Sequence, residues 1–598
     1  MKHLYNKVIK AHSIMCLFLV FTIGCNTHKK EVYVKKESNQ RLEALQAYYT
    51  NHLNNCILEL NKLYSSYTLE EKQQYYLNAR REFKLVEPIL AFADKENYKS
   101  LNAPNILKVE EEDATDIKIR NPFGFQVIEE ILFGEEDIDT KELNDVVLKT
   151  NNRLKLVTVN NKLYLKEYHV LWLLRDALAR VALLGVTGFD SPILEQSLKE
   201  AKLNYETIQF ILEQYDSSFS NKELLKDWLL EINKTIRILK GSFNDFNRYN
   251  FIQEHTHKQL VLLKETANNW KVKFPLTMAF NNNITSLFSK ETFNIVFFSD
   301  YHHLEKENFS KKVVLGKRLF NDKRLSKDTK MSCTTCHDQN KAFTDGRIAF
   351  ENQTRNSPTL TYASLQKSFF HDGRAGSLEG QIVGVVTNKV EFHSNLKELL
   401  ETVKKDPFYK NEFTSLYGKV TDFTIRNAIA NYIRTLNMFN SKFDRNINGV
   451  EKTLTSQEVN GFNLFTGKAK CATCHFPPVF NGTVPPNFLE SELESIGVPN
   501  LKQSKLDDDL GRYELFKTEE RKHFFKTPTV RNIKETAPYM HNGTYQTLEE
   551  VVDFYNKGGG IGLGFHLDNQ TLPPDELNLT DQEVSDIVVF MKSLSDNY

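Results

Sequence analysis

The sequence predicts a mainly α-helical protein that begins with a helical bundle, and two observations support this. Between residues about 40 and 265, apolar side chains recur at steps of three and four, the spacing of one helix face. The alternation of apolar and polar residues that is typical of strands is scarce in the same region. The chain has 598 residues, and because single hydrophobic cores stop growing near roughly 250–300 residues, we expect more than one domain.

The composition argues against two classes of protein. The 77 basic and 77 acidic side chains give a formal net charge of zero. A protein held on nucleic acid by phosphate contacts would show a basic excess, so no nucleic-acid partner is expected. An apolar fraction of 40% with 12% aromatic residues supplies a packed core and excludes wholesale disorder.

The N-terminus has the pattern of an export signal. Lys2, Lys7 and Lys10 precede the apolar stretch 14–23, which is too short to span a bilayer and lies just before Cys25. The end of this stretch resembles a bacterial lipobox, which implies that Cys25 becomes a lipid-carrying N-terminus. The alternative is an ordinary cleaved signal in which Cys25 has no role. No later stretch reaches ~18 uncharged apolar residues, so nothing else is expected to span a membrane.

The helical half can be justified element by element. Apolar residues over 42–63 lie on one helix face, which includes Cys56, and we expect Cys56 to be a buried, inert thiol. Residues 170–184 are strongly apolar but contain Arg175 and Asp176, and they predict a core helix, while residues 224–239 repeat the amphipathic pattern. Residues about 266–305 show no clear period and are interpreted as a connector.

Three segments of this half resemble the imelysin-like helical domains of bacterial envelope proteins. They are 80–90 (RREFKLVEPIL), 101–107 (LNAPNIL) and 124–129 (GFQVIE). The pattern of that family is G-x-H-x-x-E, and here Gln126 stands in the place of the His. Gln is a poor ligand for transition metals, so metal binding and peptidase-like chemistry do not carry over. A scaffold or docking domain is the preferred interpretation.

The C-terminal half contains two C-x-x-C-H motifs, Cys333–His337 and Cys471–His475. Two thiols at this spacing can bond the two vinyl groups on one edge of a haem, and the adjacent His then falls under the iron as an axial ligand. The motifs therefore predict two covalently bound c-type haems. The alternatives are a redox C-x-x-C pair and a four-Cys zinc site, and both leave the two His residues unexplained.

The sequence around these motifs resembles the bacterial dihaem cytochrome c peroxidase family, which includes the MauG-type enzymes, over residues about 310–598. That resemblance implies two mainly helical cytochrome-c-like domains with one haem each. The predicted fold is therefore mainly α, an N-terminal helical-bundle domain followed by two cytochrome-c-like haem domains. The blocks that carry the resemblance are 315–326, 332–338, 342–347, 355–360, 369–381, 388–392 and 525–559.

We therefore divide the chain into five parts. They are a lipoprotein-type signal peptide (1–25), a tether (26–40), an imelysin-like helical domain with its connector (41–300), an N-terminal haem domain that reacts with peroxide (301–450) and a C-terminal haem domain that transfers electrons (451–598).

The resemblance also implies roles for single residues. Gln381 matches the Gln that borders the peroxide pocket, and Glu391 matches the catalytic Glu, which can take a proton from bound peroxide and return it to the leaving oxygen. The alternative for Glu391 is a solvated surface acid. Asn356, Thr536 and Pro538 match positions that hold a calcium ion between the haem domains, and oxygen ligands suit calcium.

Three departures from the family pattern bear on function. The loop 348–354 lacks the His that caps the first haem in many members, which predicts an open first haem. His371 replaces the Trp between the haems, where it is a doubtful electron relay but can form a polar bridge or an alternative ligand. The second axial ligand of the C-terminal haem matches Tyr555, with Met540 as second choice. The alternative for Tyr555 is a core residue of an amphipathic helix.

Three functions follow as hypotheses. The first is a peroxidase that reduces hydrogen peroxide with electrons from a small donor cytochrome or other redox protein. The second is a MauG-like oxidoreductase, in which both haems store oxidising equivalents and oxidise a protein or organic substrate. The third is a non-enzymatic dihaem electron carrier or sensor. The expected location is the periplasmic side of the bacterial cell envelope, with a lipid anchor, and the resemblance leaves both a monomer and a homodimer open.

Overall fold

A computed structural model describes residues 40–111, 115–299 and 308–597. The predicted signal peptide, with Cys25, and tether residues 26–39 lie outside the described residues. Helices dominate the described parts, which confirms the mainly α prediction, and strands occur there only as two antiparallel pairs. No helix in these ranges is long and apolar enough to cross a membrane. The strands are β1 (Lys108–Glu110) with β2 (Lys118–Arg120), and β3 (Leu493–Glu494) with β4 (Phe525–Lys526).

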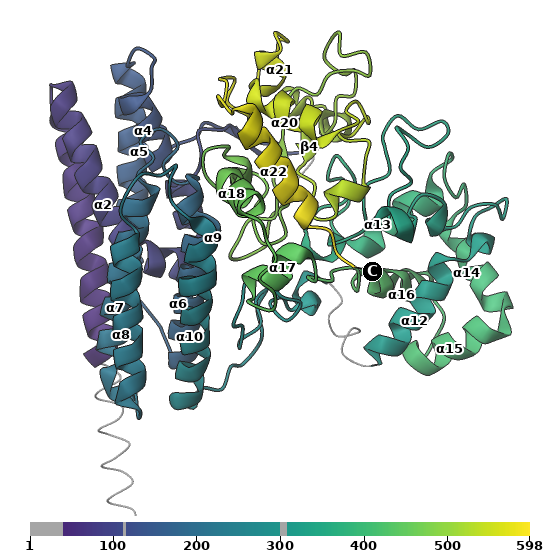
Figure 1. The fold of residues 1–598 in the computed structure, drawn as a ribbon, viewed down its shortest axis with the longest axis horizontal. Coiled ribbons are helices and arrows are strands. Elements are labelled where there is room, and N and C mark those ends of the chain that lie inside the picture. Colours follow the sequence, from purple (N-terminus) through teal and green to yellow (C-terminus); the bar gives the residue numbers. More distant parts are fainter. Residues whose placement is uncertain (1–39, 112–114, 300–307, 598) are drawn as a thin grey trace, which may run out of the picture.

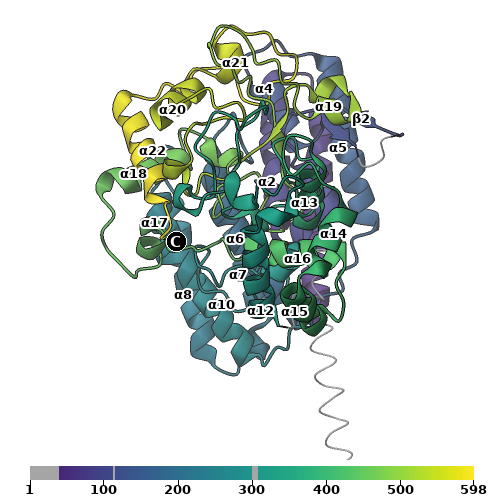
Figure 2. The same ribbon diagram turned by 90° about the vertical axis from the view of Figure 1, so that its right-hand side faces the viewer.

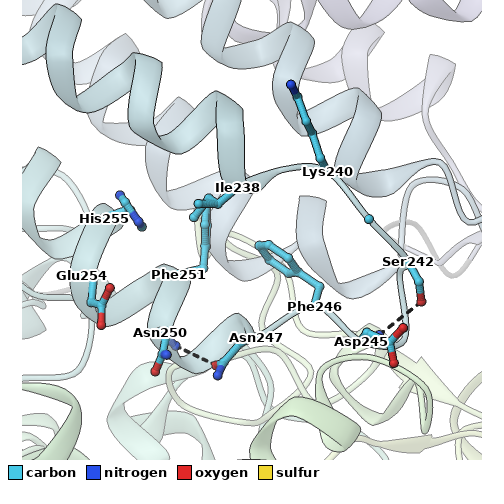
Figure 3. A pocket seen from close by; sticks show the side chains of 11 residues that line it. Ile238, Lys240, Ser242, Asp245, Phe246, Asn247, Asn250, Phe251, Glu254 and His255 are labelled. Carbon is cyan, nitrogen blue, oxygen red and sulfur yellow. Dashed lines mark hydrogen bonds between the residues drawn. The ribbon is translucent and has the colours of Figure 1, made fainter.

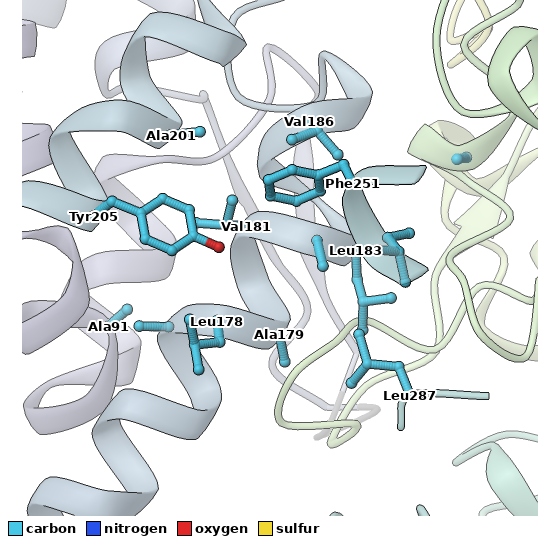
Figure 4. Close-up of a cluster of buried hydrophobic side chains, with 14 of the residues drawn as sticks. Ala91, Leu178, Ala179, Val181, Leu183, Val186, Ala201, Tyr205, Phe251 and Leu287 are labelled. Atoms are coloured by element: carbon cyan, nitrogen blue, oxygen red, sulfur yellow. The ribbon is translucent and has the colours of Figure 1, made fainter. Parts of the chain in front are cut away.

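The N-terminal half is a bundle of long helices, as its periodicity predicts. The face that includes Cys56 is buried, and the Cys56 thiol is fully enclosed and donates to the Ala79 carbonyl. Figure 4 shows part of the interior, where the Phe251 ring lies beside Val186, and both belong to the buried apolar core. The bundle consists of residues 40–65 and α2 (Leu69–Ala93), α3 (Lys95–Leu101), α4 (Phe125–Phe133), α5 (Thr140–Val159), α6 (Glu167–Leu183), α7 (Ser197–Gln214), α8 (Lys222–Ile238), α9 (Arg248–Asn250), a π-helical turn Phe251–Thr256 and α10 (His257–Asn269).

The two haem-motif domains are built from shorter helices with long connections. Residues 270–299 lead into them with little regular structure, in line with the predicted connector. The first domain contains α12 (Phe309–Phe320), α13 (Leu378–Thr387), α14 (Leu396–Lys405), α15 (Pro407–Tyr417) and α16 (Asp422–Ile433). The second contains α18 (Ser456–Phe465), α19 (Tyr513–Phe516), α20 (Leu548–Asn556), α21 (Gly559–Gly562) and α22 (Asp581–Ser593), with α17 (Lys442–Ile447) between the two domains.

In each haem-motif domain, the first and the last helix pack closely against each other at a glycine. In the first domain, a Cβ on Gly316 of α12 would overlap the Ala428 carbonyl of α16. In the second, a Cβ on Gly461 of α18 would overlap the Asp586 carbonyl of α22. Only glycine permits so close an approach of two helices.

Helix starts in the second domain follow a sequence rule. Helices α18, α20 and α22 each begin with Thr-x-x-Glu, in which the Thr hydroxyl accepts from the Glu backbone N–H and the Glu side chain accepts from the Thr N–H. This reciprocal cap satisfies two otherwise unpaired donors at each helix start. It fixes where α20, which carries Tyr555, begins.

The three parts lie in a row. Figure 1 shows the bundle on the left, the second haem-motif domain in the middle and the first on the right, and Figure 2 gives the view at 90°. One buried apolar core runs without interruption from the bundle, for example Leu60, into the second domain, for example Phe590. The first domain has a separate core between Leu315 and Leu436. The bundle is therefore joined most closely to the second domain.

Candidate functional site

The first C-x-x-C-H motif forms a short 3-10 turn, Cys333–Thr335. The backbone N–H of His337 donates to the Cys333 carbonyl at 3.0 Å, which closes the turn. The His337 Nδ1 lies 2.9 Å from the Phe343 carbonyl oxygen. A ring that donates from Nδ1 keeps its lone pair on Nε2, the atom then available to bind iron. Burial lowers the pKa of His337 and so favours the neutral ring.

The second motif is built in the same way, on the turn Cys471–Thr473. The backbone N–H of His475 donates to the Cys471 carbonyl at 2.9 Å. Its Nδ1 lies 3.0 Å from the Pro528 carbonyl oxygen and 3.3 Å from that of Phe480. Burial lowers the pKa of His475 to about 4, so this ring is neutral as well.

The residues of both motifs fit covalently attached haem. The five cysteines within the described ranges form no disulfide, so each motif presents two free thiols. Burial raises the pKa of Cys333 to about 12 and that of Cys336 to about 11, which keeps both protonated. Two thiols beside a neutral, oriented imidazole are the donor set that a c-type haem requires. The redox-pair alternative offers no reason for the orientation of the imidazoles.

Glu391 lies beside the first motif, just after α13. Burial is the main cause of the raised pKa of Cys333 and Cys336, and the negative charge of Glu391 adds to the rise in both. The carboxylate is held by Asn388, whose Nδ2 donates to Glu391 Oε1 at 2.6 Å. Burial also raises the pKa of Glu391, against the opposing effects of Asn388 and the positive Arg374. The structure thus brings this acid to the motif, half-buried rather than on open surface.

Gln381 lies on α13, the helix that leads to Glu391. Glu379, on the same helix, anchors it to the rest of the domain. Its carboxylate accepts a hydrogen bond from Arg434 at 2.9 Å, and both side chains are almost fully buried. Asn427 also donates to this carboxylate, at 3.0 Å. Gln381 itself is half-buried. A buried ion pair next to it therefore fixes the helix that carries it.

His371 lies where the two haem-motif domains meet: its ring bonds within the first domain, and its main-chain carbonyl bonds the second. Its Nε2 donates to the Asn356 carbonyl at 3.0 Å, and its own carbonyl accepts from the Lys526 N–H at 2.7 Å. Burial lowers the pKa of His371 to about 3, so the ring is neutral. The loop 348–354, which has no histidine, packs against Gly543 of the second domain.

Tyr555 lies near the second motif. Burial raises the pKa of its phenol, and the neighbouring Cys474 and Cys471 add to the rise. Tyr555 is the eighth residue of α20, and its ring packs at the edge of the continuous core. Met540 adopts a left-handed backbone with φ of 68°, and its carbonyl accepts from Asn356 Nδ2 at 2.7 Å.

An internal repeat links the two domains, and sequence reasoning missed it. Residues 355–387 align with residues 525–557 at a constant offset, with S-P-T against T-P-T and H-D-G against H-N-G. The bonds between the domains obey the repeat, because Asn356 N–H donates to the His541 carbonyl at 2.8 Å while its counterpart Lys526 N–H donates to His371. In this alignment Tyr555 corresponds to Val385. A comparison of the two haem-motif domains with each other would have found the signal.

Sequence reasoning also missed Glu494, which lies near the second motif. The second domain contains an insertion between His475 and residue 525 that the first domain lacks, and β3 with Glu494 belongs to it. Burial raises the pKa of Glu494 to about 7, and its carboxyl group interacts with Cys474. No motif marks this acid, because strand pairing between distant segments brings it to the site.

The predicted calcium residues are only partly assembled. Asn356 Nδ2 donates to the carbonyls of Pro538, at 3.1 Å, and Met540, at 2.7 Å. The Thr536 hydroxyl instead donates to the Ile533 carbonyl at 3.2 Å. Two carbonyl oxygens therefore converge, but the Asn356 amide presents its nitrogen to them, and a cation would need the opposite orientation.

A surface hollow in the helical half lies away from both motifs (Figure 3). It sits where α8 ends and α9 begins, and Lys240, Asp245 and Glu254 are among its lining residues. His255, also in its wall, already contacts the Glu231 carboxylate at 2.6 Å. The hollow therefore lacks a cluster of groups aimed at one point.

Comparisons with known proteins agree with the two motifs. A family described as "Di-haem cytochrome c peroxidase" matches residues 310–452. "Cytochrome-c peroxidase IdrP2" of Denitromonas iodatirespirans is 34% identical over 312 residues, which cover 47% of this chain and 81% of that protein. "Methylamine utilization protein MauG" of Methylorubrum extorquens is 32% identical over 295 residues, covering 47% and 78%. The crystal structure of a "MauG-like protein associated with microbial copper homeostasis" has 27% identity and a TM-score of 0.42, and the match covers 48% of this chain and 90% of that one.

Proposed function

This chain belongs to the di-haem cytochrome c peroxidase family and is an oxidoreductase of the peroxidase type with two c-type haems, and from that premise we propose that it reduces hydrogen peroxide at the first haem site with electrons collected at the second. The observation that carries the proposal is the half-buried Glu391 carboxylate beside Cys333 and Cys336. Reduction of one peroxide to two water molecules consumes two electrons and two protons. A redox partner supplies the electrons, and this acid moves a proton.

The residues of the first site have separate tasks in this proposal. Cys333 and Cys336 would hold the haem, and His337, oriented by the Phe343 carbonyl, would bind its iron. The bound haem supplies the redox chemistry that breaks the O–O bond. Glu391, oriented by Asn388, takes the proton from the near oxygen of peroxide and gives it to the leaving oxygen.

The raised pKa of Glu391 suits this task. A general acid–base group works best when its pKa lies close to the operating pH, and burial moves the pKa of Glu391 in that direction. Gln381 borders the same space from α13. The loop 348–354 contains no histidine, so it offers no imidazole to close the first site.

Tyr555 is proposed as the second axial ligand at the second site, with Met540 as the alternative. A phenolate prefers ferric iron and lowers the potential, whereas a thioether raises it. The position of Tyr555 near Cys471 and Cys474 supports the Tyr, and the repeat offers only Val385 at the corresponding place of the first site. The proposal thus has one closed and one open haem.

Changing Tyr555 to Phe is expected to alter the second haem alone. The substitution keeps the ring that packs in the core but removes the oxygen that would bind iron, so the low-spin absorption and electron paramagnetic resonance signals of this haem should change. The first haem, in the same sample, is the internal reference. Met540→Leu is the matched variant, and a change caused by it but not by Tyr555→Phe would transfer the ligand role to Met540.

One alternative function has an observation in its favour. A MauG-like oxidoreductase, which oxidises a protein or organic substrate, requires a second haem that can share oxidising equivalents, and a Tyr ligand suits that role better than Met. Addition of peroxide without any electron donor separates the two. A long-lived change in the absorption of both haems would favour the MauG-like function, and rapid loss of peroxide only when a donor is present would favour the peroxidase.

We extend the proposal to location and partners. An export signal and a lipid on Cys25 would place the protein on the periplasmic side of the cell envelope, where c-type haem is attached. The electron donor is then a small cytochrome or another redox protein of that compartment. A calcium ion held by Asn356, Thr536 and Pro538 is part of the same proposal, and it requires the Asn356 amide to turn its oxygen toward the Pro538 carbonyl.

Peroxide consumption with a reduced small c-type cytochrome tests the main proposal. The haem content is first measured on the same sample, because the experiment is informative only for a protein with both haems. Steady turnover that requires both peroxide and donor is expected. A protein with both haems that consumes no peroxide with any donor would instead be an electron carrier or sensor.

A further inference from the structure

Loop 188–194 of the helical half contacts both flanks of the second C-x-x-C-H motif. The Phe189 ring meets the Phe476 ring edge to face, with centroids 5.8 Å apart, and Phe476 directly follows the motif. Lys470 directly precedes the motif, and its Nζ donates to the Pro192 carbonyl at 3.2 Å. Two residues of one loop, Phe189 and Pro192, thus bracket the five residues that would hold the haem.

The inward side chain of the same loop, Asp190, is fixed by a buried polar network. Lys84 Nζ contacts Asp190 Oδ2 at 2.7 Å, Asn102 Nδ2 donates to Asp190 Oδ1 at 2.7 Å, and Arg80 donates to the Asp190 carbonyl at 2.6 Å. All four residues are almost fully buried. Although burial acts in the other direction, Lys84 and Arg80 hold the pKa of Asp190 below its ordinary value. A buried, paired charge resists displacement, because separating the pair leaves an uncompensated charge.

Glu129 fixes the rest of the loop. Its Oε1 accepts from the backbone N–H groups of Ile193, at 3.1 Å, and Leu194, at 3.0 Å, and the Ser191 hydroxyl donates to the same carboxylate. The Tyr76 hydroxyl donates to the other oxygen at 3.0 Å. Glu129 and Ser191 are almost fully buried. The residues that hold the loop come from the segments 80–90, 101–107 and 124–129, which sequence analysis singled out for another reason.

The two C-x-x-C-H motifs differ in exposure in a way that matches this contact. At the second residue of the motif, Thr334 is exposed in the first site, whereas Ala472 is fully buried in the second. Two residues after the His, Gln339 is exposed, whereas its counterpart Pro477 is buried. The apolar core that continues from the bundle into the second domain is consistent with the greater burial of the second motif. The covered motif is the one next to loop 188–194.

We propose that the helical half is a built-in cap on the second haem site, seated through loop 188–194, which positions the attachment motif and keeps a protein electron donor off the haem edge that Cys471 and Cys474 bond. The inference rests on the proposed function only in that the second motif carries haem. A donor protein must then reach the second haem from another side. Asp190 and Glu129 are positioning residues, because they act on the motif through the loop.

Two variants of the full-length dihaem protein test the cap. Phe189→Ala removes the outward contact of the loop, and Asp190→Asn weakens its inward anchor without touching the haem domains. For each variant we would measure the midpoint potential and electron paramagnetic resonance signal of both haems, and the rates of reduction by a reduced small c-type cytochrome and by a small inorganic complex. Gln253→Ala is the control, because Gln253 Nε2 bonds the Asn446 carbonyl, a contact between the halves at a different place.

We expect both loop variants to shift the potential and signal of the second haem while the first haem stays as in the wild type. The ratio of the rate with the cytochrome to the rate with the small complex should rise severalfold. A shift in potential changes both rates, whereas an opened protein surface helps only the cytochrome. The control should match the wild type. A second haem that is unchanged in both loop variants, or shifts that appear equally in both haems, would overturn the cap. A wild-type protein with no haem at the second motif would overturn the proposed function instead.

Discussion

Replacing Glu391 by Gln is expected to slow the reaction with hydrogen peroxide by about 10²–10⁴-fold, the usual contribution of a positioned acid–base group. The amide keeps the size of the side chain, and a rotated amide can still accept from Asn388, but it cannot take up the peroxide proton at neutral pH. The measurement is the rate of the first absorption change after rapid mixing of peroxide with the purified dihaem protein. Haem content and both resting spectra should match the wild type.

The pH dependence of this rate provides an independent check. Glu391 must be deprotonated to accept a proton, so the wild-type rate should fall as pH decreases through its pKa. Because burial raises that pKa, the fall should begin at a higher pH than for an ordinary Glu. Arg374→Met removes a positive charge that lowers the pKa of Glu391, so the rate should begin to decrease at a still higher pH. A Glu391→Gln protein that keeps both the wild-type rate and the acid limb would remove Glu391 from the mechanism.

The features predicted correctly from the sequence are those with a local signature. The periodicity over 42–63 predicts a buried helix face, and Cys56 is indeed fully buried. The stretches 170–184 and 224–239 correspond to α6 and α8, within a few residues at each end. Each C-x-x-C-H motif forms its own turn. At the first site, the residues that set the position of the His337 ring lie within about ten residues of one another, so the local sequence is enough to predict it.

The features that were missed depend on contacts between distant parts of the chain. Lys470 and Pro192 are 278 residues apart, and nothing in either local sequence marks the contact. The segment 124–129 shows the same limit. The Gln126 amide donates to the nearby Asn102 carbonyl, whereas the Glu129 carboxylate accepts hydrogen bonds from a loop more than sixty residues away in sequence. A family pattern drew attention to these residues, but only the fold shows what they hold.

The boundary between the two haem-motif domains illustrates another limit. The predicted boundary lies at residue 450, yet Phe439, Phe443 and Ile447 pack in the core shared by the bundle and the second domain. The first domain's own core ends at Leu436. The position of a motif in the sequence does not determine to which hydrophobic core the neighbouring segment contributes, because this depends on how its side chains pack in the fold.

Arg531→Met is expected to lower the free energy of unfolding by about 3–5 kcal/mol, the usual cost of removing one partner of a buried ion pair. Arg531 and Asp444 are both 0% exposed, and Arg531 Nη1 and Nη2 contact the two carboxylate oxygens at 2.8 Å and 2.9 Å. Burial opposes the charged form, but the adjacent Asp444 raises the pKa of Arg531 above its ordinary value. Without the guanidinium, the Asp444 charge remains buried and unpaired.

The effect should reach both haem-motif domains, because Arg531 bonds three parts of the chain at once. Its Nε donates to the Pro478 carbonyl, three residues past the second motif, and Nη1 reaches the Tyr362 hydroxyl of the first domain at 3.3 Å. Thermal unfolding followed at the absorption of the haems is the measurement. Arg120→Met is the control, since Arg120 is 58% exposed and pairs with Glu110, which is 29% exposed, and loss of such a surface pair costs about 0–1 kcal/mol. Equal losses for the two variants would mean that the buried pair is not what locks the domains together.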